Sequence, residues 1–235
     1  MSFQFKEFFV EDGRCAMKVG TDSVLLGAWC DVDGARCVVD AGAGCGLLSL
    51  MVAQRNRGCT VVAVELDGEA CADCRANFAA SPWSGRLSLV EESLFAYSPE
   101  CAPDLIVSNP PFFTETLQSP DARRASARHA GALGPLSLIS YAAAVLSPEG
   151  RLCMVTPASA EGDIAFAAGL ERMNVRSKLF VVPRRGRAPQ RILWELSRVA
   201  GPLVTRTLEL RDDGGDWTGE YARLVEPFYL RMPRP

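Results

Sequence analysis

Four consecutive residues in the middle of the chain carry its most specific chemical pattern. Asn109-Pro110-Pro111-Phe112 follows an apolar run and combines a carboxamide, two prolines that hold the backbone extended, and an aromatic ring. The amide oxygen of Asn109 and the carbonyl oxygen of Pro110 can accept hydrogen bonds from an amine whose lone pair is delocalised into a ring. Such acceptors favour the pyramidal nitrogen that attacks a methyl group, and Phe112 can stack on a base. The pattern therefore predicts methylation of an exocyclic adenine amine, by positioning and charge complementarity and without a metal.

A glycine-rich segment forms the second chemical pattern. Asp40, Gly42, Gly44 and Gly46 lie between an apolar run and a helical pattern, where glycines let the backbone approach a ligand and a helix N-terminus supplies N–H donors. Glu65 ends the next apolar run, where a carboxylate can accept hydrogen bonds from both hydroxyls of a ribose. A dinucleotide fingerprint would need its third glycine at position 47, which is a leucine. The spacing is instead typical of S-adenosylmethionine sites.

The elements that must position these two patterns alternate between strands and helices. Apolar runs predict the strands, and the last two strands are joined by a segment with two prolines and no helix, which predicts an antiparallel hairpin. We therefore expect an α/β fold of the class I methyltransferase (Rossmann-like) type, with a seven-stranded, mostly parallel sheet, a C-terminal antiparallel hairpin and helices on both faces. Strands are expected at residues 37–41, 60–66, 87–91, 104–108, 151–156, 175–182 and 192–198, and helices at 47–54, 68–80, 136–146 and 162–173.

No repeat, low-complexity tract or linker divides the chain, which is expected to form a single methyltransferase domain. Its parts would be an N-terminal lid and helix segment (1–35), a Rossmann-like core (36–200) and a C-terminal extension (201–235). Within the first part, Thr21, Asp22 and Ser23 could cap a short helix that runs to Trp29, because side-chain oxygens accept hydrogen bonds from the free N–H groups of a helix start.

Composition limits the class of protein. The chain has 235 residues, of which 48% are hydrophobic, enough for one α/β domain with a sizeable core. No secretory signal or long apolar stretch is present, so a soluble, cytoplasmic protein is expected. We also expect a monomer, although no motif in the sequence bears on the oligomeric state. The nine cysteines are an odd number without a secretory context, and we expect reduced thiols. Cys71 and Cys74 form the only C-x-x-C pair and are expected to be ordinary helix residues, because a zinc site would lack further ligands.

Arginines gather after two of the predicted strands. The net charge is −3 and only three of the 25 basic residues are lysines, so the distribution of charge matters more than its total. If the first hairpin strand is parallel to the others, both clusters lie at the edge that holds Asn109, where phosphates beside an inserted base would pass. A single-stranded loop would be the cheaper target, because a base in a stem must first be extruded. The predicted RNA-binding residues are Arg123, Arg124 and Arg128, next to His129, and Arg184, Arg185, Arg187 and Arg191 in the hairpin loop.

Longer segments of the chain resemble, in order, one known family. It is the bacterial family of tRNA (adenine-N6)-methyltransferases that modify adenine 37, next to the anticodon of a valine tRNA. The C-A-M-K-V-G-T-D segment is far more specific to this family than the glycine loop. The matching segments are residues 5–10 (FKEFFV), 15–22 (CAMKVGTD), 25–29 (LLGAW), 40–44 (DAGAG), 63–66 (AVEL), 81–83 (SPW), 108–113 (SNPPFF) and 228–230 (FYL).

The resemblance implies a class I fold, S-adenosylmethionine as methyl donor, tRNA as substrate and residues 109–112 as the catalytic residues. It also implies that residues 18–22 form a lid against the methionine end of the cofactor. The implied cofactor-binding residues are Lys18, Gly20, Thr21 and Asp22 of the lid and Leu66 beside Glu65.

One position departs from the family pattern. Where the family usually has an aspartate to meet the adenine amine of the cofactor, this chain has Ser93, preceded by Glu92. Either Glu92 substitutes for that aspartate or the contact is weaker. Both residues are therefore candidate cofactor contacts.

Three other functions fit part of the pattern. A protein glutamine N5-methyltransferase faces the same problem of a conjugated nitrogen, and similar enzymes use N-P-P-[FY]. An rRNA guanine-N2 methyltransferase would have similar motifs. A catalytically inactive module that binds the cofactor or RNA is the third possibility, but such a module has no use for Asn109.

Overall fold

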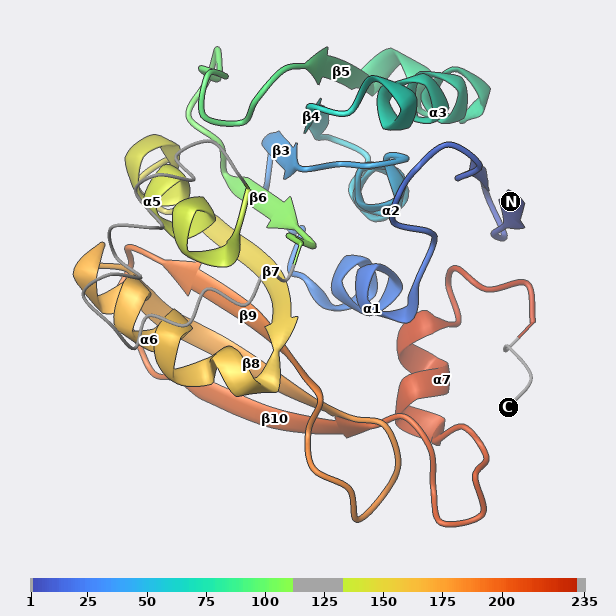
Figure 1. Ribbon diagram of the computed structural model, residues 1–235, viewed down its shortest axis with the longest axis vertical. Helices are drawn as coiled ribbons and strands as arrows, with labels where there is room; N and C mark the ends of the chain where they lie inside the picture. Colours follow the sequence, from blue (N-terminus) through green and yellow to red (C-terminus); the bar gives the residue numbers. More distant parts are fainter. Residues whose placement is uncertain (1, 112–132, 232–235) are drawn as a thin grey trace.

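The computed structural model describes residues 2–111 and 133–231, and its centre is a large, mostly parallel β-sheet (Figure 1). Its strands are β3 (Cys37–Ala41), β4 (Thr60–Glu65), β5 (Leu87–Glu91), β6 (Leu105–Ser108), β7 (Arg151–Pro157), β8 (Asn174–Val182), β9 (Arg191–Ser197) and β10 (Val204–Glu209). Their order is β10-β8-β9-β7-β6-β3-β4-β5. Neighbouring strands are parallel except where β9 pairs with β7 and β8.

The first seven of these strands match the sequence prediction, and their ends differ from it by one residue at most. The predicted antiparallel hairpin is β8 and β9, with β9 inserted between β7 and β8. The eighth strand, β10, was not predicted, so the expected sheet was one strand short. Its first four residues are exposed at the sheet edge, and its sequence V-T-R-T-L-E has no continuous apolar run.

Helices cover both faces of the sheet, as predicted. One face carries α1 (Thr21–Trp29), α2 (Leu47–Arg55), α3 (Gly68–Ala80) and α7 (Gly219–Val225), and the other carries α5 (Pro135–Val145) and α6 (Glu161–Leu170). Because successive strand residues point to opposite faces, Val38 belongs to the first core and Val39 to the second. In the described part of the chain, none of the helices is long and apolar enough to cross a membrane.

The N-terminal residues add structure that the sequence reading did not resolve. β1 (Ser2–Gln4) and β2 (Phe9–Glu11) form a small antiparallel pair outside the main sheet. The predicted short helix is α1, but its N-cap is Gly20, which has no side chain to cap with. The expected capping role of residues 21–23 was therefore wrong: the helix already begins at Thr21, so these residues form its first turn. The side chains of Asp22 and Ser23 instead contact Arg191 and Asn109.

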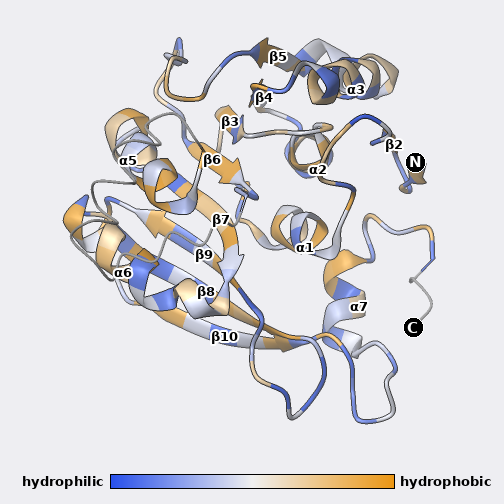
Figure 2. Cartoon of the chain, viewed as in Figure 1, coloured by the Kyte–Doolittle hydropathy of each residue, from blue (hydrophilic) through white to orange (hydrophobic). Residues whose placement is uncertain are grey.

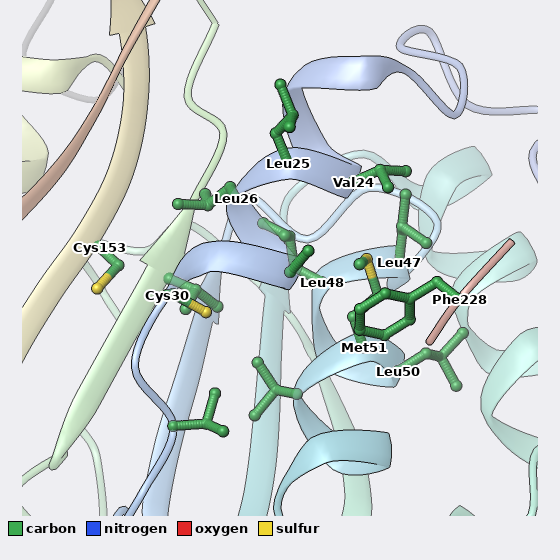
Figure 3. Close-up of a cluster of buried hydrophobic side chains, with 14 of the residues drawn as sticks. Val24, Leu25, Leu26, Cys30, Leu47, Leu48, Leu50, Met51, Cys153 and Phe228 are labelled. Carbon is green, nitrogen blue, oxygen red and sulfur yellow. The ribbon is translucent and has the colours of Figure 1, made fainter. Parts of the chain in front are cut away.

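Close packing of α1 on α2 fixes where α1 can place those side chains. A Cβ atom at Gly27 would lie 2.6 Å from the Sδ atom and 3.1 Å from the Cβ atom of Met51, so a larger residue at position 27 would require the Met51 side chain to move. Figure 3 shows the buried cluster around this contact, which includes Leu25 and Leu26 of α1 and Leu48 and Met51 of α2. The first turn of α1 is thereby held at a fixed height above the sheet.

One pair of cysteines departs from the expected thiols. Cys37 and Cys101 form a disulfide, and the seven other cysteines are free and buried. The two partners are 64 residues apart in the sequence, so no local pattern could have paired them. Asp104, three residues after Cys101, is bonded to Cys37: its backbone N–H donates to the carbonyl of Cys37 and its carboxylate accepts from the N–H of Cys37, so the segment that carries Cys101 lies beside Cys37. Cys71 and Cys74 are ordinary buried residues of α3, as predicted.

Candidate active site

A cavity of about 290 Å³ lies at the carboxyl ends of three neighbouring strands. Its walls include the loop after β3, the last residue of β4 and Asn109 after β6. β3 lies between β4 and β6, so the sheet reverses its strand order here, which is where ligands of open α/β sheets bind. Residues 15–19 of the N-terminal segment complete the walls. We call this space the donor cavity.

The glycines of the loop after β3 adopt a backbone shape that other residues rarely tolerate. Gly42, Gly44 and Gly46 have φ angles of 68°, 55° and 81°. L-residues with a side chain disfavour this left-handed region, which explains the glycine at each position. The loop crosses toward β4, where the backbone N–H groups of Gly42 and Ala43 donate to the carbonyl of Val64. Gly42 and Gly44 line the donor cavity, whereas Gly46 caps the start of α2.

Asp40 lies beneath the loop and is fully buried. Its Oδ2 atom accepts hydrogen bonds from the backbone N–H of Ser49 at 2.9 Å and from the Ser49 hydroxyl at 2.7 Å, which stabilises the first turn of α2. Oδ1 is buried without a hydrogen-bond partner among the described residues. Burial, with a smaller contribution from Glu65, raises the pKa of Asp40 to about 7 against the opposing hydrogen bonds from Ser49. Asp40 does not line the donor cavity, so its contribution there is to hold the loop.

Glu65 closes the loop from the other side. Its Oε2 atom accepts a hydrogen bond from the N–H of Gly44 at 2.8 Å, and Oε1 accepts from the N–H groups of Leu66 at 2.8 Å and Asp67 at 2.9 Å. A carboxylate can accept about four hydrogen bonds, so capacity remains, mainly on Oε2. Glu65 and Asp67 both line the donor cavity.

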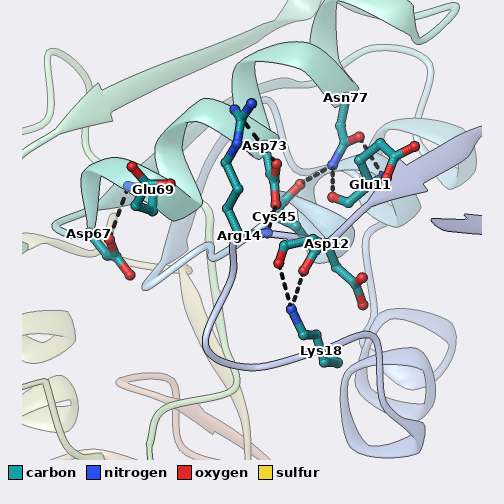
Figure 4. A network of polar contacts seen from close by, with 10 residues as sticks. Glu11, Asp12, Arg14, Lys18, Cys45, Asp67, Glu69, Asp73 and Asn77 are labelled. Atoms are coloured by element: carbon teal, nitrogen blue, oxygen red, sulfur yellow. Dashed lines mark hydrogen bonds and ion pairs between the residues drawn. The ribbon is translucent and has the colours of Figure 1, made fainter. Parts of the chain in front are cut away.

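The N-terminal segment is tied to α3 and to itself by a polar network (Figure 4). Asn77 of α3 accepts from the N–H of Glu11, and the backbone N–H of Arg14 donates to Asp73 at 2.7 Å. Lys18, a predicted lid residue, donates from Nζ to the carbonyl of Asp12 at 2.6 Å. The segment is therefore held over the donor cavity, and Lys18 lines it.

Two thiols in the donor cavity were not predicted as site residues. Cys15 of the N-terminal segment and Cys45 of the glycine loop both line it. A hydrogen bond to the Cys45 thiol and burial raise the pKa of Cys15 well above its ordinary value of 9.0. Cys15 is therefore an uncharged thiol near neutral pH. The sequence offered no signal for this contact, because cysteines scattered through apolar runs are usually core residues.

Asn109 is held in one orientation by α1. Its Nδ2 group donates to the hydroxyl of Ser23 at 2.9 Å, and its Oδ1 atom is buried without a partner among the described residues. The preceding Ser108 donates to the carbonyl of Ala41 at 2.7 Å, which fixes the end of β6 beside the glycine loop. Ser23 was missed as a site residue, because nothing in the sequence indicates which side chains of α1 face β6.

The other residues of the catalytic pattern divide into three cases. Pro111 lines the donor cavity beside Asn109, Pro110 is buried, and Phe112 lies outside the described residues. Eight predicted cofactor residues do not line the donor cavity: Asp40 and Gly46, described above, and six others. The six others are Gly20, the N-cap of α1; Thr21 and Asp22, which line a second cavity; Leu66, which is 64% exposed; and Glu92 and Ser93, which follow β5.

The hairpin arginines lie at the predicted edge. β8 is antiparallel to β9, which is antiparallel to β7, so β8 ends at the same edge as β6. The loop after β8 is largely hydrophilic (Figure 2). We call this loop, residues 183–190, together with Arg191 the hairpin region. The other predicted cluster, Arg123, Arg124, Arg128 and His129, lies outside the described residues.

Acidic groups from distant segments contact the hairpin region. Arg185 pairs with Glu209 at 2.9 Å and with Asp213 at 3.6 Å, and Arg184 donates to the carbonyl of Asp213. Arg191 pairs in the same way with Asp22 of α1 at 2.8 Å. Within the described residues, the side chain of Arg187 makes no such contact. The sequence showed no acid inside this cluster, but the fold brings acids to it.

Comparisons with known proteins agree with this geometry. Residues 15–178 match the family model of the methyltransferase small domain. The chain is 39% identical, over 98% of both sequences, to the tRNA1(Val) (adenine(37)-N6)-methyltransferases of Aeromonas hydrophila subsp. hydrophila and Phocaeicola vulgatus. Its fold is similar to a structure described as a predicted O-methyltransferase from Agrobacterium tumefaciens, with a TM-score of 0.67 and 19% identity over 88% of this chain and 96% of that one. A ribosomal protein L11 methylase from Lactobacillus delbrueckii subsp. bulgaricus gives 0.58 and 19% over 81% and 84%. With the strand order, these likenesses confirm the predicted fold class.

Proposed function

Because the chain belongs to the family of tRNA1(Val) (adenine(37)-N6)-methyltransferases, we propose that it transfers a methyl group from S-adenosylmethionine to N6 of an adenine in tRNA. The expected target is adenine 37 of a valine tRNA, next to the anticodon, because the names of the relatives specify this base and this tRNA. An enzyme with this substrate is expected to work in the cytoplasm.

The observation that carries the proposal is the buried amide oxygen of Asn109, which has no hydrogen-bond partner among the residues that the structure describes. A buried acceptor without a partner costs about 1–3 kcal/mol, so its presence at the wall of a cavity points to a donor that arrives with a ligand. Ser23 occupies the Nδ2 side of the amide, which leaves the oxygen as the group that faces an incoming amine. An amine N–H that donates to this oxygen would favour the pyramidal nitrogen that attacks the methyl group.

The residues of the donor cavity fit the proposed cofactor. S-adenosylmethionine supplies an electrophilic methyl group when it is bound. We propose that Glu65 uses the free capacity of Oε2 to accept from a ribose hydroxyl, while Gly42 and Gly44 let the backbone approach the ligand. Lys18 and the N-terminal segment would cover the ligand and exclude water. The other predicted cofactor contacts, including Glu92 and Ser93, would need a shift of their segments toward the cavity.

The hairpin region supports RNA as the substrate. Its arginines lie at the same edge of the sheet as Asn109, where phosphates on either side of an inserted base would pass. We propose that Arg187 and, after exchange of its acidic partners, Arg185 contact these phosphates. The same role is proposed for Arg184 and, in the other cluster, for Arg123, Arg124 and Arg128. Arg191 is paired with Asp22, and we propose that it contacts the RNA through a group other than a phosphate.

Identification of the methylated product tests the function directly. The purified protein is incubated with radiolabelled S-adenosylmethionine and unmodified valine tRNA, and the RNA is digested to nucleosides and separated. We expect the label in N6-methyladenosine and its loss when adenine 37 is replaced. Label in N2-methylguanosine, or in a glutamine residue when protein extract replaces the RNA, would contradict the proposal and identify the enzyme as one of its rivals.

The variant Asn109→Ala tests the observation that carries the proposal. We expect kcat to fall by roughly 10²–10³, the usual cost of removing one preorganised polar group from a reacting site. Affinity for S-adenosylhomocysteine, measured by calorimetry, should change little, because Asn109 faces the amine rather than the ribose. A melting temperature near that of the parent protein would show that the fold is intact. Turnover that survives this change would remove Asn109 from the mechanism.

A further inference from the structure

A second cavity, of about 210 Å³, lies on the other side of the first turn of α1. Ser23 lines the donor cavity, while its neighbours Thr21 and Asp22 line the second one. Consecutive side chains of a helix point about 100° apart, so one helical turn can form a wall of both spaces. The two cavities share no lining residue in the described part of the chain. We call the second space the flanking cavity, and its other lining residues are Leu25, Val181, Pro183, Gln190, Arg191 and Leu210.

The lining of the flanking cavity suits a flat, uncharged group with polar edges. Leu25 and Val181 are buried and give it apolar walls. Asp22 and Arg191 pair at 2.8 Å, so their charges largely cancel, whereas a phosphate site is expected to present unpaired cations. The pair still offers acceptors and donors to a ligand that carries both kinds of group.

Gln190 adds an adaptable polar group to the rim. Its side chain is exposed and makes no hydrogen bond within the described residues. Its backbone is fixed, because its N–H donates to the carbonyl of Val181 at 2.9 Å and its carbonyl accepts from the N–H of Ala158 at 3.0 Å. A carboxamide presents a donor and an acceptor side by side, which matches the edge of a nucleobase.

We propose that the flanking cavity receives the base of a second nucleotide in the RNA strand, near the adenine that is methylated. This inference rests on the proposed function, because it takes RNA as the substrate. β6 and β8 end at the same edge of the sheet, three strand spacings or about 15 Å apart. An RNA strand whose target base reaches Asn109 can therefore pass over the flanking cavity. Unstacked bases of single-stranded loops are bound in this way, with their faces against apolar groups and their edges hydrogen-bonded.

A double-mutant cycle, which combines a change in the protein with a change in the RNA, tests whether the flanking cavity holds a base. Valine tRNA is assembled with an abasic nucleotide in place of each anticodon-loop residue in turn, the target excepted. For each RNA, kcat/KM for N6 methylation is measured with the parent protein and with Gln190→Ala. At one position the abasic change should cost the parent protein about tenfold, as expected when a stacked base is removed. Gln190→Ala should lower kcat/KM for intact tRNA. For the tRNA that is abasic at the sensitive position it should cause little further loss, because both changes remove the same contact.

Arg187→Ala is the matched control, because Arg187 lies in the same loop but does not line the flanking cavity. Its effect should add to that of every abasic change, as expected for a phosphate contact that carries no base information. If the effects of Gln190→Ala are equally additive at every loop position, the flanking cavity does not hold a base. Failure of the parent protein to form N6-methyladenosine in intact tRNA would instead reject the proposed function, so the two failures are distinguishable.

Discussion

The donor cavity and the hairpin region use their charged groups in opposite ways. Around the donor cavity, carboxylates bind the backbone: Asp40 holds the first turn of α2, and Glu65 holds the glycine loop and the turn after β4. In the hairpin region, charges contact other charges at the surface, as in the pair between Arg185, whose side chain is 53% exposed, and Asp213, whose side chain is 77% exposed. Hydrogen bonds from the backbone to a buried carboxylate fix the shape of a loop, whereas exposed ion pairs can exchange partners.

This difference predicts where single changes will matter. Buried groups with fixed partners are costly to disturb, because a donor or acceptor left without a partner cannot turn to water. Exposed ion pairs contribute about 0–1 kcal/mol and weaken with salt. The donor cavity should therefore respond strongly to conservative substitutions and the hairpin region weakly. The donor cavity would then be a rigid site for a small ligand, and the hairpin region an adaptable surface for a flexible RNA strand.

The largest expected effect is on the free energy of unfolding, which should depend on pH through the ionisation of Asp40. Its pKa is raised from 3.8 to about 7, so the folded protein binds this proton more tightly than the unfolded chain does. The stability from this proton is complete below about pH 4 and is lost as the pH rises toward 7. At about 1.4 kcal/mol per pKa unit, the loss amounts to at most about 4 kcal/mol. Urea unfolding of the parent protein and of Asp40→Asn, from pH 5 to pH 8, measures it.

The asparagine variant has nearly the shape of a protonated aspartate and cannot ionise, and its amide oxygen can still accept from Ser49. We expect the parent protein to lose stability relative to Asp40→Asn across this range, and the difference to level off above pH 7. The difference between the two proteins removes the contributions of all other titrating groups. A constant difference from pH 5 to pH 8 would mean that Asp40 ionises normally and that the glycine loop tolerates a buried charge.

A smaller effect is expected from Glu65→Gln. Oε1 of Glu65 accepts from Leu66 and Asp67, and Oε2 accepts from Gly44, so an amide must place its NH₂ group against at least one of these donors. One such unsatisfied donor costs about 1–3 kcal/mol. If this energy is lost from cofactor binding, the affinity falls by about 10- to 100-fold. Calorimetry with S-adenosylhomocysteine measures the affinity, and hydrogen exchange of residues 42–46 reports the loosened loop.

Glu69→Gln is the matched control for this change. Glu69 is nearby in the first turn of α3, carries the same charge and is exposed. Its replacement alters the charge of the region equally without touching the glycine loop, and affinity should change by less than about twofold. Equal effects of the two substitutions would show that net charge, and not the bonds of Glu65 to the backbone, governs binding here.

The parts of this molecule that could be predicted from sequence are those in which local pattern and fold coincide. The buried strands read correctly because both faces of the sheet are covered, and their apolar runs are almost continuous. β10 was not predicted, because an edge strand with four exposed residues has no continuous apolar run. The disulfide between Cys37 and Cys101 was not predicted because it joins two segments that are far apart in the sequence.

The same reasoning explains which site residues could be predicted from the sequence and which could not. Gly42, Gly44 and Gly46 could be predicted because their positive φ angles demand glycine at those positions. Ser23 could not, because its importance arises only when α1 packs against the end of β6. The acidic partners of Arg185 could not be predicted either, because they belong to the unpredicted β10 and the turn that follows it. Contacts between distant segments are what the sequence patterns did not contain.

The smallest effects are expected in the hairpin region, where Arg187→Ala and Arg185→Ala can be compared. Arg187 makes no side-chain contact within the described residues, so its charge is available to a phosphate, while Arg185 must first leave Glu209 and Asp213. Arg187→Ala should therefore weaken tRNA binding a few-fold at low salt and make the dependence of log K on log salt shallower by about 0.7–0.9, the value of one phosphate contact. Arg185→Ala should have the smaller effect on both quantities, measured by fluorescence anisotropy at several salt concentrations. The reverse order would show that phosphates readily displace the acidic partners. The ion pairs of the hairpin region would then be a resting state of its RNA-binding surface, and the contrast with the donor cavity would be sharper still, because no ligand is expected to displace the backbone bonds of Glu65.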